Sequence, residues 1–303
     1  MAAIRKVAVL GGSGNLGPHV INGLLAAGFE VTAITRLESQ ATFADGVSVN
    51  RVDITSKEAV ENILQGHDAL VSTISPAALG DQRTIIDAAI AAKVRRFIPS
   101  EFGIDTRRTE ETSLGWILAN KLNVTDYLSE VVKKNPWFSW TGLAVGLFFD
   151  WGIKTQFLLG INAKEKTGTI VDSGNKPYAA THVSFIGETV AAILRKPEET
   201  ANKYLSVFSF ATTQNEVLKI FEEESGSKFQ ITNMKGSDLI KAATESVAKG
   251  DYYNSMVPYV QYTFLSDDSK DPVNTGKNDA DLLGLQDKLS LRESIKKELS
   301  EIQ

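Results

Sequence analysis

Residues 6–17 read Lys-Val-Ala-Val-Leu-Gly-Gly-Ser-Gly-Asn-Leu-Gly, an apolar run that ends in a cluster of glycines. Three of the glycines have the spacing G-x-x-G-x-x-G, and the apolar periodicity of a helix follows over Leu16–Ala27. On a strand-to-helix turn, the first glycine permits the tight bend, the second lets the backbone approach a pyrophosphate, and the third lets helix and strand pack closely. The helix start adds N–H donors and a positive dipole. The turn therefore predicts a dinucleotide-binding loop, with an ordinary glycine turn as the alternative; its residues are Gly11, Gly12, Ser13, Gly14, Asn15, Leu16 and Gly17.

The rest of the first half alternates between strand-like and helix-like segments. Such alternation is typical of a parallel sheet covered by helices on both faces. Strands are predicted at Lys6–Leu10, Glu30–Arg36, Val47–Val52, Ala69–Ile74, Arg96–Pro99 and Phe138–Val145. Helices are predicted at Leu16–Ala27, Lys57–Leu64, Gln82–Ala92 and Ser113–Lys134, and Gly28 and Gly66 stand where two of them should end. We expect an α/β fold with a doubly wound parallel sheet, which binds its ligand beyond the carboxyl ends of the strands.

The alternation weakens after Asp150. Helices are predicted at Gly187–Leu194, Gln214–Glu224 and Ser237–Ala248, a polar loop at Asp267–Asp281, and a strand at Lys203–Phe210 that could rejoin the main sheet. The sequence therefore predicts a dinucleotide-binding domain over residues 1–150. Residues 151–303 are expected to form mainly a smaller, substrate-binding lobe over the strand ends, with a segment near 183–210 returning to the main sheet.

The end of the second predicted strand indicates which dinucleotide the loop would bind. A carboxylate at this position would bind the ribose 2′-hydroxyl of NAD, but none is present before Glu38. Arg36 instead offers a planar, charged fork for a 2′-phosphate. The sequence favours NADP(H), and a solvated surface arginine is the alternative interpretation of Arg36.

Lys121 interrupts an apolar stripe on the long helix predicted at Ser113–Lys134. The stripe has helical spacing and comprises Ile117, Lys121, Val124, Leu128 and Val131. Burial disfavours an ammonium group, and a lysine tuned toward neutrality can relay protons. The alternative is a lysine that extends its charge along the helix to solvent. The Tyr-x-x-x-Lys pair of many reductases is absent, since no tyrosine has a lysine four residues later.

Composition excludes several other classes of protein. With 37 acidic and 32 basic residues, the formal net charge is 32 − 37 = −5, which argues against nucleic-acid binding. The chain has no cysteine, so it has neither disulfides nor thiolate chemistry. No metal-ligand spacing is found among the three histidines, and no Gly-x-Ser-x-Gly elbow follows a strand. The apolar segments are too short for a signal peptide or a membrane helix, so we expect a soluble, cytoplasmic protein.

Two further landmarks, taken with the glycine loop, indicate a family. They are the segment Arg96-Phe97-Ile98-Pro99-Ser100-Glu101-Phe102-Gly103 and the lysine at position 121. The chain resembles the NmrA-like, isoflavone-reductase-like family of atypical short-chain reductases. Plant members of that family include phenylcoumaran benzylic ether reductases, pinoresinol–lariciresinol reductases and eugenol synthase. The similarity extends into the second half, where Asp172-Ser173-Gly174-Asn175-Lys176 resembles the Gly-Asn-x-Lys turn of the family.

The resemblance implies a Rossmann-type domain with NADP(H) along the strand ends and substrate between the two lobes. It implies that Lys121 transfers the proton and lies beside the cofactor, and that Arg36 binds the 2′-phosphate. The other residues that it places near the cofactor are Thr73, Ser75, Ser100, Glu101 and Phe102. From the residues alone, Glu101 could instead cap a helix, and Phe102 could fill the core.

The chain also departs from the plant pattern. Val124 and Thr125 stand where those members usually carry an arginine, and Ala144-Val145-Gly146 replaces an Asn-x-Phe sequence. The aromatic run Phe148-Phe149-Asp150-Trp151 that follows suggests a flat, apolar substrate, with packing between the lobes as the alternative. These departures argue against a plant lignan as the substrate.

The sequence thus favours an NADPH-dependent reductase of a small aromatic or phenolic metabolite, in secondary metabolism, with Lys121 as the proton-transfer residue. One alternative is a non-catalytic regulator of the NmrA type, which binds dinucleotide and a protein partner without turnover. Another is an isomerase or lyase that uses Lys121 as a base without net hydride transfer. The substrate and the oligomeric state are left open by the sequence.

Overall fold

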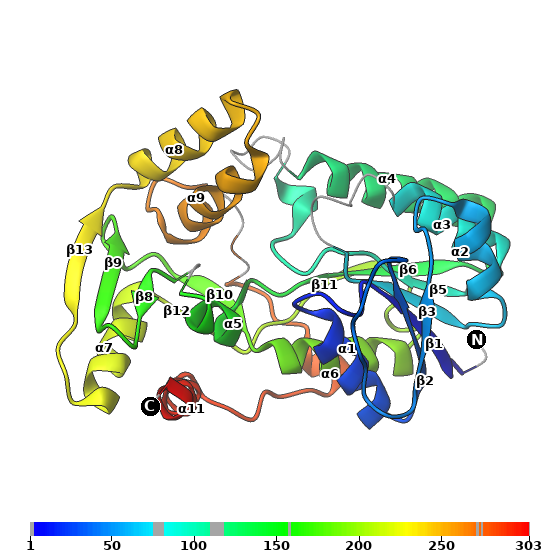
Figure 1. Ribbon diagram of the computed structural model, residues 1–303, viewed down its shortest axis with the longest axis horizontal. Coiled ribbons are helices and arrows are strands. Elements are labelled where there is room, and N and C mark those ends of the chain that lie inside the picture. The colour runs from blue at the N-terminus through cyan, green and yellow to red at the C-terminus, as the bar shows by residue number, and fades with distance from the viewer. Residues whose placement is uncertain are drawn as a thin grey trace.

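The structure is a computed structural model that describes residues 3–74, 82–109, 118–156, 159–270, 273 and 275–302. A seven-stranded sheet in the order β11-β6-β5-β4-β1-β2-β3 dominates it, with every neighbouring pair parallel (Figure 1). Its strands are β1 (Lys6–Leu10), β2 (Glu30–Thr35), β3 (Val47–Arg51), β4 (Ala69–Ser72), β5 (Arg96–Ile98), β6 (Ser139–Ala144) and β11 (Lys203–Ser206). The strand order reverses between β1 and β4, and sheets of this kind bind their ligands at that point. The predicted doubly wound parallel sheet is confirmed.

Helices cover both faces of this sheet because successive strand residues point to opposite sides. Val7 and Val9 of β1 belong to a core with α1 (Gly17–Ala26) and α6 (Val183–Arg195). Ala8 and Leu10 point into a second core with α2 (Lys57–Leu64), α3 (Gln82–Ala91) and α4 (Ala119–Lys134), on the other side of the sheet in Figure 1. As predicted, Gly28 and Gly66 follow α1 and α2, with φ angles of +84° and +77°. Residues 113–117 of the predicted long helix lie outside the described residues.

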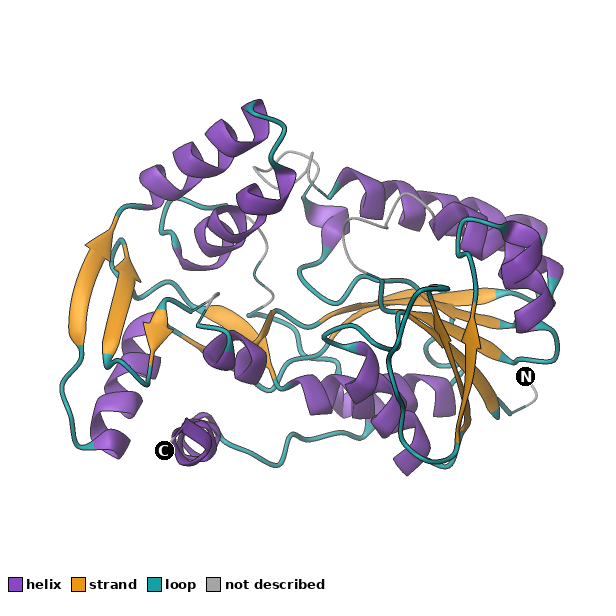
Figure 2. Ribbon diagram, in the orientation of Figure 1, coloured by secondary structure: helices purple, strands orange, loops and turns teal. Residues whose placement is uncertain are grey.

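A third hydrophobic core lies in the second half of the chain. Two three-stranded sheets contribute to it, in the orders β12-β10-β7 and β13-β9-β8, and Figure 2 shows them apart from the main sheet. Their strands are β7 (Leu147–Phe148), β8 (Ile161–Asn162), β9 (Thr167–Val171), β10 (Tyr178–Thr181), β12 (Phe210–Thr212) and β13 (Gln230–Met234). The remaining helices are the 3₁₀ turn η2 (Thr106–Arg108), α5 (Phe149–Lys154), α7 (Gln214–Ser225), α8 (Gly236–Ala248), α9 (Tyr252–Leu265), α10 (Ala280–Leu283) and α11 (Leu291–Ile302). Within the described ranges, no helix combines the length and apolarity needed to cross a membrane.

Two elements from the second half belong to the layers of the main sheet. Strand β11 pairs in parallel with β6, so that Leu205 lies opposite Leu143. Helix α6 packs beside α1, the helix that follows the glycine loop. The polar segment predicted at Asp267–Asp281 ends in the short helix α10, which packs on α6. The dinucleotide-type sheet is thus completed only after the chain has passed residue 200.

A buried histidine joins the start of α6 to the C-terminal segment. The Nδ1 atom of His182 lies 2.6 Å from a carboxylate oxygen of Asp287, and its Nε2 lies 2.7 Å from the hydroxyl oxygen of Ser294 on α11. Burial opposes the charge on Asp287, but hydrogen bonds from His182 and Ser209 outweigh burial and hold the pKa of Asp287 below its ordinary value. The same carboxylate therefore ties α6 to the segment that leads into α11.

Helices α1 and α6 approach each other through two glycines. A Cβ atom on Gly23 of α1 would lie 2.4 Å from the carbonyl carbon of Gly187, and one on Gly187 would lie 2.1 Å from the carbonyl oxygen of His19. Both distances are below any normal contact, so the two backbones touch where neither helix carries a side chain. This contact fixes the position of α1 against the sheet.

We expect Gly187→Ala to lower the free energy of unfolding by about 1–3 kcal/mol, because the added methyl group forces two backbones apart. Helix propensity alone would favour alanine by about 1 kcal/mol, so the two effects have opposite signs. Ser184→Ala, on the exposed side of α6, is the control and should change stability by less than about 0.5 kcal/mol. Urea unfolding followed by circular dichroism measures both; a Gly187→Ala protein as stable as the wild type would contradict the contact.

Candidate functional site

The glycine loop folds back on itself between β1 and α1. The amide of Gly11 donates to the Ile34 carbonyl at 3.1 Å, and the amide of Gly14 donates to the Gly11 carbonyl at 3.0 Å. Gly11 has a φ of +82°, a conformation that glycine adopts at little cost. A Cβ on Gly17 would lie 2.4 Å from the Gly11 carbonyl oxygen. The first and third glycines of the motif are therefore required by the turn itself.

The tip of this loop is the part that remains open. Ser13, Gly14 and Asn15 are exposed, whereas Gly12, Leu16 and Gly17 are buried. A Cβ on Gly14 would meet no protein atom closer than 3.4 Å, so its lack of a side chain is not required by packing. Helix α1 begins directly behind the tip with no acidic residue in its first turn and no side-chain cap. An exposed glycine tip before an uncapped helix start fits a phosphate group.

Arg36 lies immediately after β2, next to the glycine loop in the sheet. Its side chain is exposed, and within the described residues its guanidinium forms no hydrogen bond or ion pair. Arg51 at the end of β3 lies opposite Thr35, and its guanidinium donates to the carbonyls of Ser39 at 2.7 Å and Ala41 at 3.1 Å. Arg51 thereby holds the loop that follows Arg36. Arg51 was not among the predicted site residues, although a basic side chain near the end of the strand predicted at Val47–Val52 was a usable signal.

Thr73 and Ser100 connect the carboxyl ends of β1, β4 and β5. The Thr73 hydroxyl donates to the Leu10 carbonyl at 2.9 Å, and Thr73 forms the wall against which Gly11 packs. The Ser100 hydroxyl donates to the Ile74 carbonyl at 2.8 Å. These residues therefore lie around one edge of the sheet, as their position after parallel strands predicts. Ser75, also predicted to lie near the cofactor, falls outside the described residues.

Glu101 and Phe102 turn into the protein. The Phe102 ring is buried in the core beneath α1 and α6, and the residue has a φ of +27°. The Glu101 side chain is fully buried, and its Oε2 accepts hydrogen bonds from Thr106 and from the Tyr204 hydroxyl, each at 2.6 Å. Tyr204 had no local signal in the sequence, since it is 103 residues away from Glu101, and Thr106 was not among the predicted site residues.

Lys121 stands in the first turn of α4, with Val124, Leu128 and Val131 buried behind it on the same face. Its Nζ donates to the main-chain carbonyl of Glu101 at 2.5 Å. Burial lowers the pKa of the Lys121 ammonium, and the negative charge of Glu101 opposes that effect in part. The amine therefore points toward the segment after β5 and not along the helix into solvent. Ile117, the first member of the predicted stripe, lies outside the described residues.

The aromatic run after β6 divides between packing and partial exposure. Phe149 is fully buried and forms edge-to-face contacts with His182 and Phe210, with ring centroids 6.0 and 4.8 Å apart. Phe148 and Trp151 are half-buried. Core packing thus explains Phe149. Within the aromatic run, only Phe148 and Trp151 keep part of their surface available.

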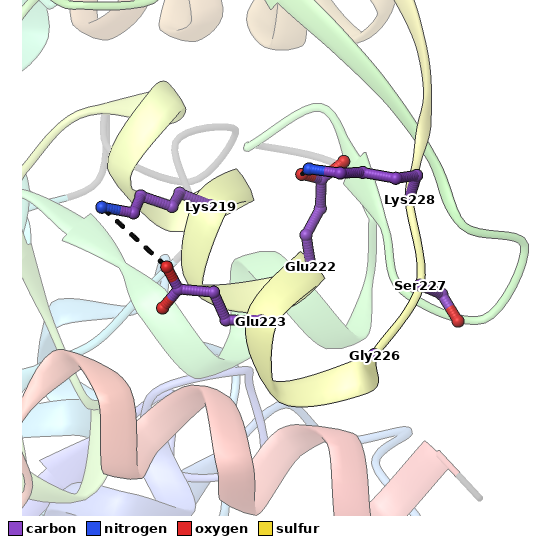
Figure 3. A pocket seen from close by; sticks show the side chains of 6 residues that line it. All are labelled: Lys219, Glu222, Glu223, Gly226, Ser227 and Lys228. Carbon is purple, nitrogen blue, oxygen red and sulfur yellow. Dashed lines mark hydrogen bonds and ion pairs between the residues drawn. The ribbon is translucent and has the colours of Figure 1, made fainter.

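Two surface hollows of the described residues lie elsewhere. One of about 300 Å³ adjoins the end of α7, where Lys228 pairs with Glu222 at 2.5 Å and Lys219 with Glu223 at 3.9 Å, so its charges are mutually satisfied (Figure 3). Another, of about 830 Å³, runs along the segment before α11. Neither is lined by a residue of the predicted site. Among the described residues there is also no group of three or more histidine, aspartate or glutamate side chains that could hold a metal ion.

We expect Gly17→Ala to lower the free energy of unfolding by about 1–3 kcal/mol, because its methyl group would collide with the Gly11 carbonyl. Gly14→Ala is the matched control, since a Cβ there makes only an ordinary contact. Its stability should remain within about 0.5 kcal/mol of the wild type. Chemical denaturation of the three proteins measures the difference; equal losses in both variants would contradict the loop geometry.

The chain is similar to known proteins over most of its length. A model of the NmrA-like family matches residues 4–262. "Oxidoreductase aprR" of Aspergillus flavus is 34% identical over 248 residues, which cover 81% of this chain and 82% of that relative. "Oxidoreductase poxI" of Penicillium oxalicum is 32% identical over 238 residues, which cover 78% of this chain and 76% of that relative.

The fold is also found among solved structures. The structure described as "AtPrR2 with NADP+ and (+)pinoresinol" superposes with a TM-score of 0.76 at 19% identity. The match covers 98% of this chain and 99% of the other. With the two fungal relatives, the family match shows that the chain belongs to the NmrA-like family.

Proposed function

We propose that the chain is an NADP(H)-dependent reductase of a small aromatic or phenolic compound. The observation that carries the proposal is the convergence, at one edge of the parallel sheet, of an open glycine loop and a partly buried lysine amine. Two relatives above 30% identity are named oxidoreductases, and a structural neighbour was solved with NADP+ and pinoresinol. These names support the class of reaction and of substrate.

The residues around the sheet edge fit this cofactor. The exposed tip Ser13–Asn15 and the start of α1 would hold the pyrophosphate, and Arg36 would bind the 2′-phosphate with its unengaged guanidinium. Thr73, Ser100 and the Glu101–Phe102 segment would lie along the rest of the dinucleotide. When bound, NADPH supplies a hydride to the substrate. The lobe built by residues 151–303, apart from α6 and β11, would bind the substrate.

Lys121 would supply the proton. Reduction of a carbonyl, an enone or a quinone methide leaves negative charge on an oxygen, which an ammonium group can neutralise by donating a proton. Because burial lowers the pKa of Lys121, the group gives up its proton more readily than a lysine in water. The Glu101 carbonyl holds the amine in place for this transfer.

We expect Arg36→Glu to reverse the dinucleotide preference. The guanidinium loses its attraction for the 2′-phosphate, and the new carboxylate repels it, so the ratio of the dissociation constants of NAD+ and NADP+ should fall by at least about tenfold, or about 1.4 kcal/mol. Lys134→Glu, which makes the same change of charge at the far end of α4, should leave the ratio unchanged. Calorimetric titration with each dinucleotide provides the measurement. An unaltered ratio in Arg36→Glu would remove Arg36 from the site.

We expect Lys121→Ala to lower kcat by about 10²- to 10⁴-fold, the usual contribution of a positioned acid. The affinity for NADP+ should stay within a few-fold. In the wild type the protonated amine is the active form, so the rate should fall as pH rises through the lowered Lys121 pKa, and the residual activity of Lys121→Ala should lack this descent.

Lys121→Arg retains the positive charge but does not release a proton near neutral pH, and it should be as inactive as the alanine variant. Reduction of a panel of aromatic ketones, enones and phenolic ethers, followed by loss of NADPH absorbance, is the assay. Unchanged turnover in Lys121→Ala would contradict the proton-transfer role. Tight NADP+ binding without turnover on any substrate would favour a dinucleotide-sensing regulator.

A further inference from the structure

Glu101 places a carboxyl group where a charge is costly. Its side chain has no exposed surface, and its Oε1 has no hydrogen-bond partner within the described part of the chain. Only Oε2 is satisfied, by the hydroxyls of Thr106 and Tyr204. An ionised carboxylate buried with half of its acceptor capacity unused opposes folding. Such a residue is better explained by what its charge does than by stability.

The surrounding chain is built to hold this carboxylate. The Tyr204 ring lies over Gly142 of the neighbouring strand β6, where a Cβ atom would fall 2.4 Å from the ring. The guanidinium of Arg107 covers the ring, with its central carbon 4.4 Å from the centroid, and is itself held by Asp105 through contacts of 2.9 and 2.8 Å. Burial and the charge of Glu101 raise the pKa of Tyr204 well above its usual value, so its hydroxyl remains a donor.

The backbone of Glu101 contacts the side chain of Lys121. The Glu101 carbonyl accepts the hydrogen bond from Nζ, and the carboxylate charge acts on the ammonium group against the effect of burial. The charged and titratable groups around the pair, among the described residues, come from three elements besides α4. They are Glu101 after β5, Asp105 and Arg107 at η2, and Tyr204 on β11.

We propose that Glu101 is a positioning residue for Lys121: its main-chain carbonyl fixes the place of the amine, and Thr106 and Tyr204 hold its side chain in the same buried segment. The charge of that carboxylate acts on the amine against the effect of burial and favours its charged form. The inference rests on the proposed function in one respect, since the charged form matters to catalysis only if Lys121 donates the proton. Without the Glu101 charge, burial alone acts on the amine and shifts it toward the neutral state, in which it has no proton to give.

The direct test is the titration of Lys121 in the full chain, which requires no turnover. Protein labelled with ¹³C at the lysine ε-carbons is followed by NMR between pH 6 and pH 10.5, and Lys121→Arg identifies the resonance. We expect Glu101→Gln, which keeps the size and the acceptor oxygen but removes the charge, to lower the Lys121 midpoint by about one pH unit or more.

Tyr204→Phe distinguishes the effect of the Glu101 charge on the Lys121 midpoint from the effect of disturbed packing. It removes a hydrogen bond from the same cluster and should lower the melting temperature as Glu101→Gln does, but it keeps the carboxylate, so the Lys121 midpoint should move by less than half as much. An unchanged midpoint in folded Glu101→Gln would overturn the proposal. Equal shifts in both variants would also overturn it, because the effect would then come from lost structure.

A double variant provides the test if Glu101→Gln does not fold. Glu101→Leu combined with Tyr204→Phe removes the buried carboxylate and one of the two hydroxyls that bond to it, and apolar exchanges of buried charged groups are often tolerated. The same fall in the midpoint is expected. The pH dependence of reduction should shift with the midpoint. If Lys121→Ala retains turnover while the midpoint still falls in Glu101→Gln, the proposed function fails and the coupling between the two residues stands.

Discussion

The turn between β1 and α1 leaves no space for a side chain at Gly17, because the carbonyl of Gly11 already occupies that position. Much of the architecture depends on this contact. It directs α1 back across the sheet, where Gly23 meets Gly187 of α6, and it leaves the loop tip exposed at the edge where β1, β4 and β5 end. An element from residues 183–195 thus supports a loop at residues 11–17 through two close backbone contacts.

The parts of the fold that the sequence predicts are those whose signals are local. In β1 the apolar run Val7–Leu10 is buried, β4 is buried along its whole length, and α2 begins after its N-cap Ser56 and stops before Gly66. The elements that it misses lack such signals. Helix α9 contains Pro258 and several tyrosines without a clear apolar period, and β13 is mostly exposed although it pairs with β9 more than 60 residues earlier.

The residues of the candidate site differ in the same respect, since some have local signals in the sequence and others do not. The spacing around Lys121 leaves open whether its amine points into the protein or along the helix to solvent, whereas the predictions of the glycine loop and of Arg36 follow from spacing along single elements. The partners of Glu101 do not, because Thr106 lies on a short 3₁₀ turn and Tyr204 on a strand that joins the sheet from the second half. The buried Arg96 is a second polar group whose partners lie far away in the sequence. It donates to the hydroxyls of Ser139, Thr141 and Thr200, and burial lowers its pKa to about 10. A periodic pattern identifies residues that share a face, but the pairing of polar groups across a core depends on topology.

The histidine at the head of α6 has a consequence for the extent of the folding unit. Its two ring nitrogens are engaged by Asp287 and by Ser294, both near the end of the chain. A shortened protein that stopped ahead of residue 287 would retain every strand of the large sheet and every glycine of the loop. It would nevertheless remove both close partners of this imidazole beneath the helix that braces that loop, leaving Nδ1 only the hydroxyl of Ser209 at 3.4 Å. We therefore expect simple truncation ahead of residue 287 to weaken the half of the molecule that carries the glycine loop.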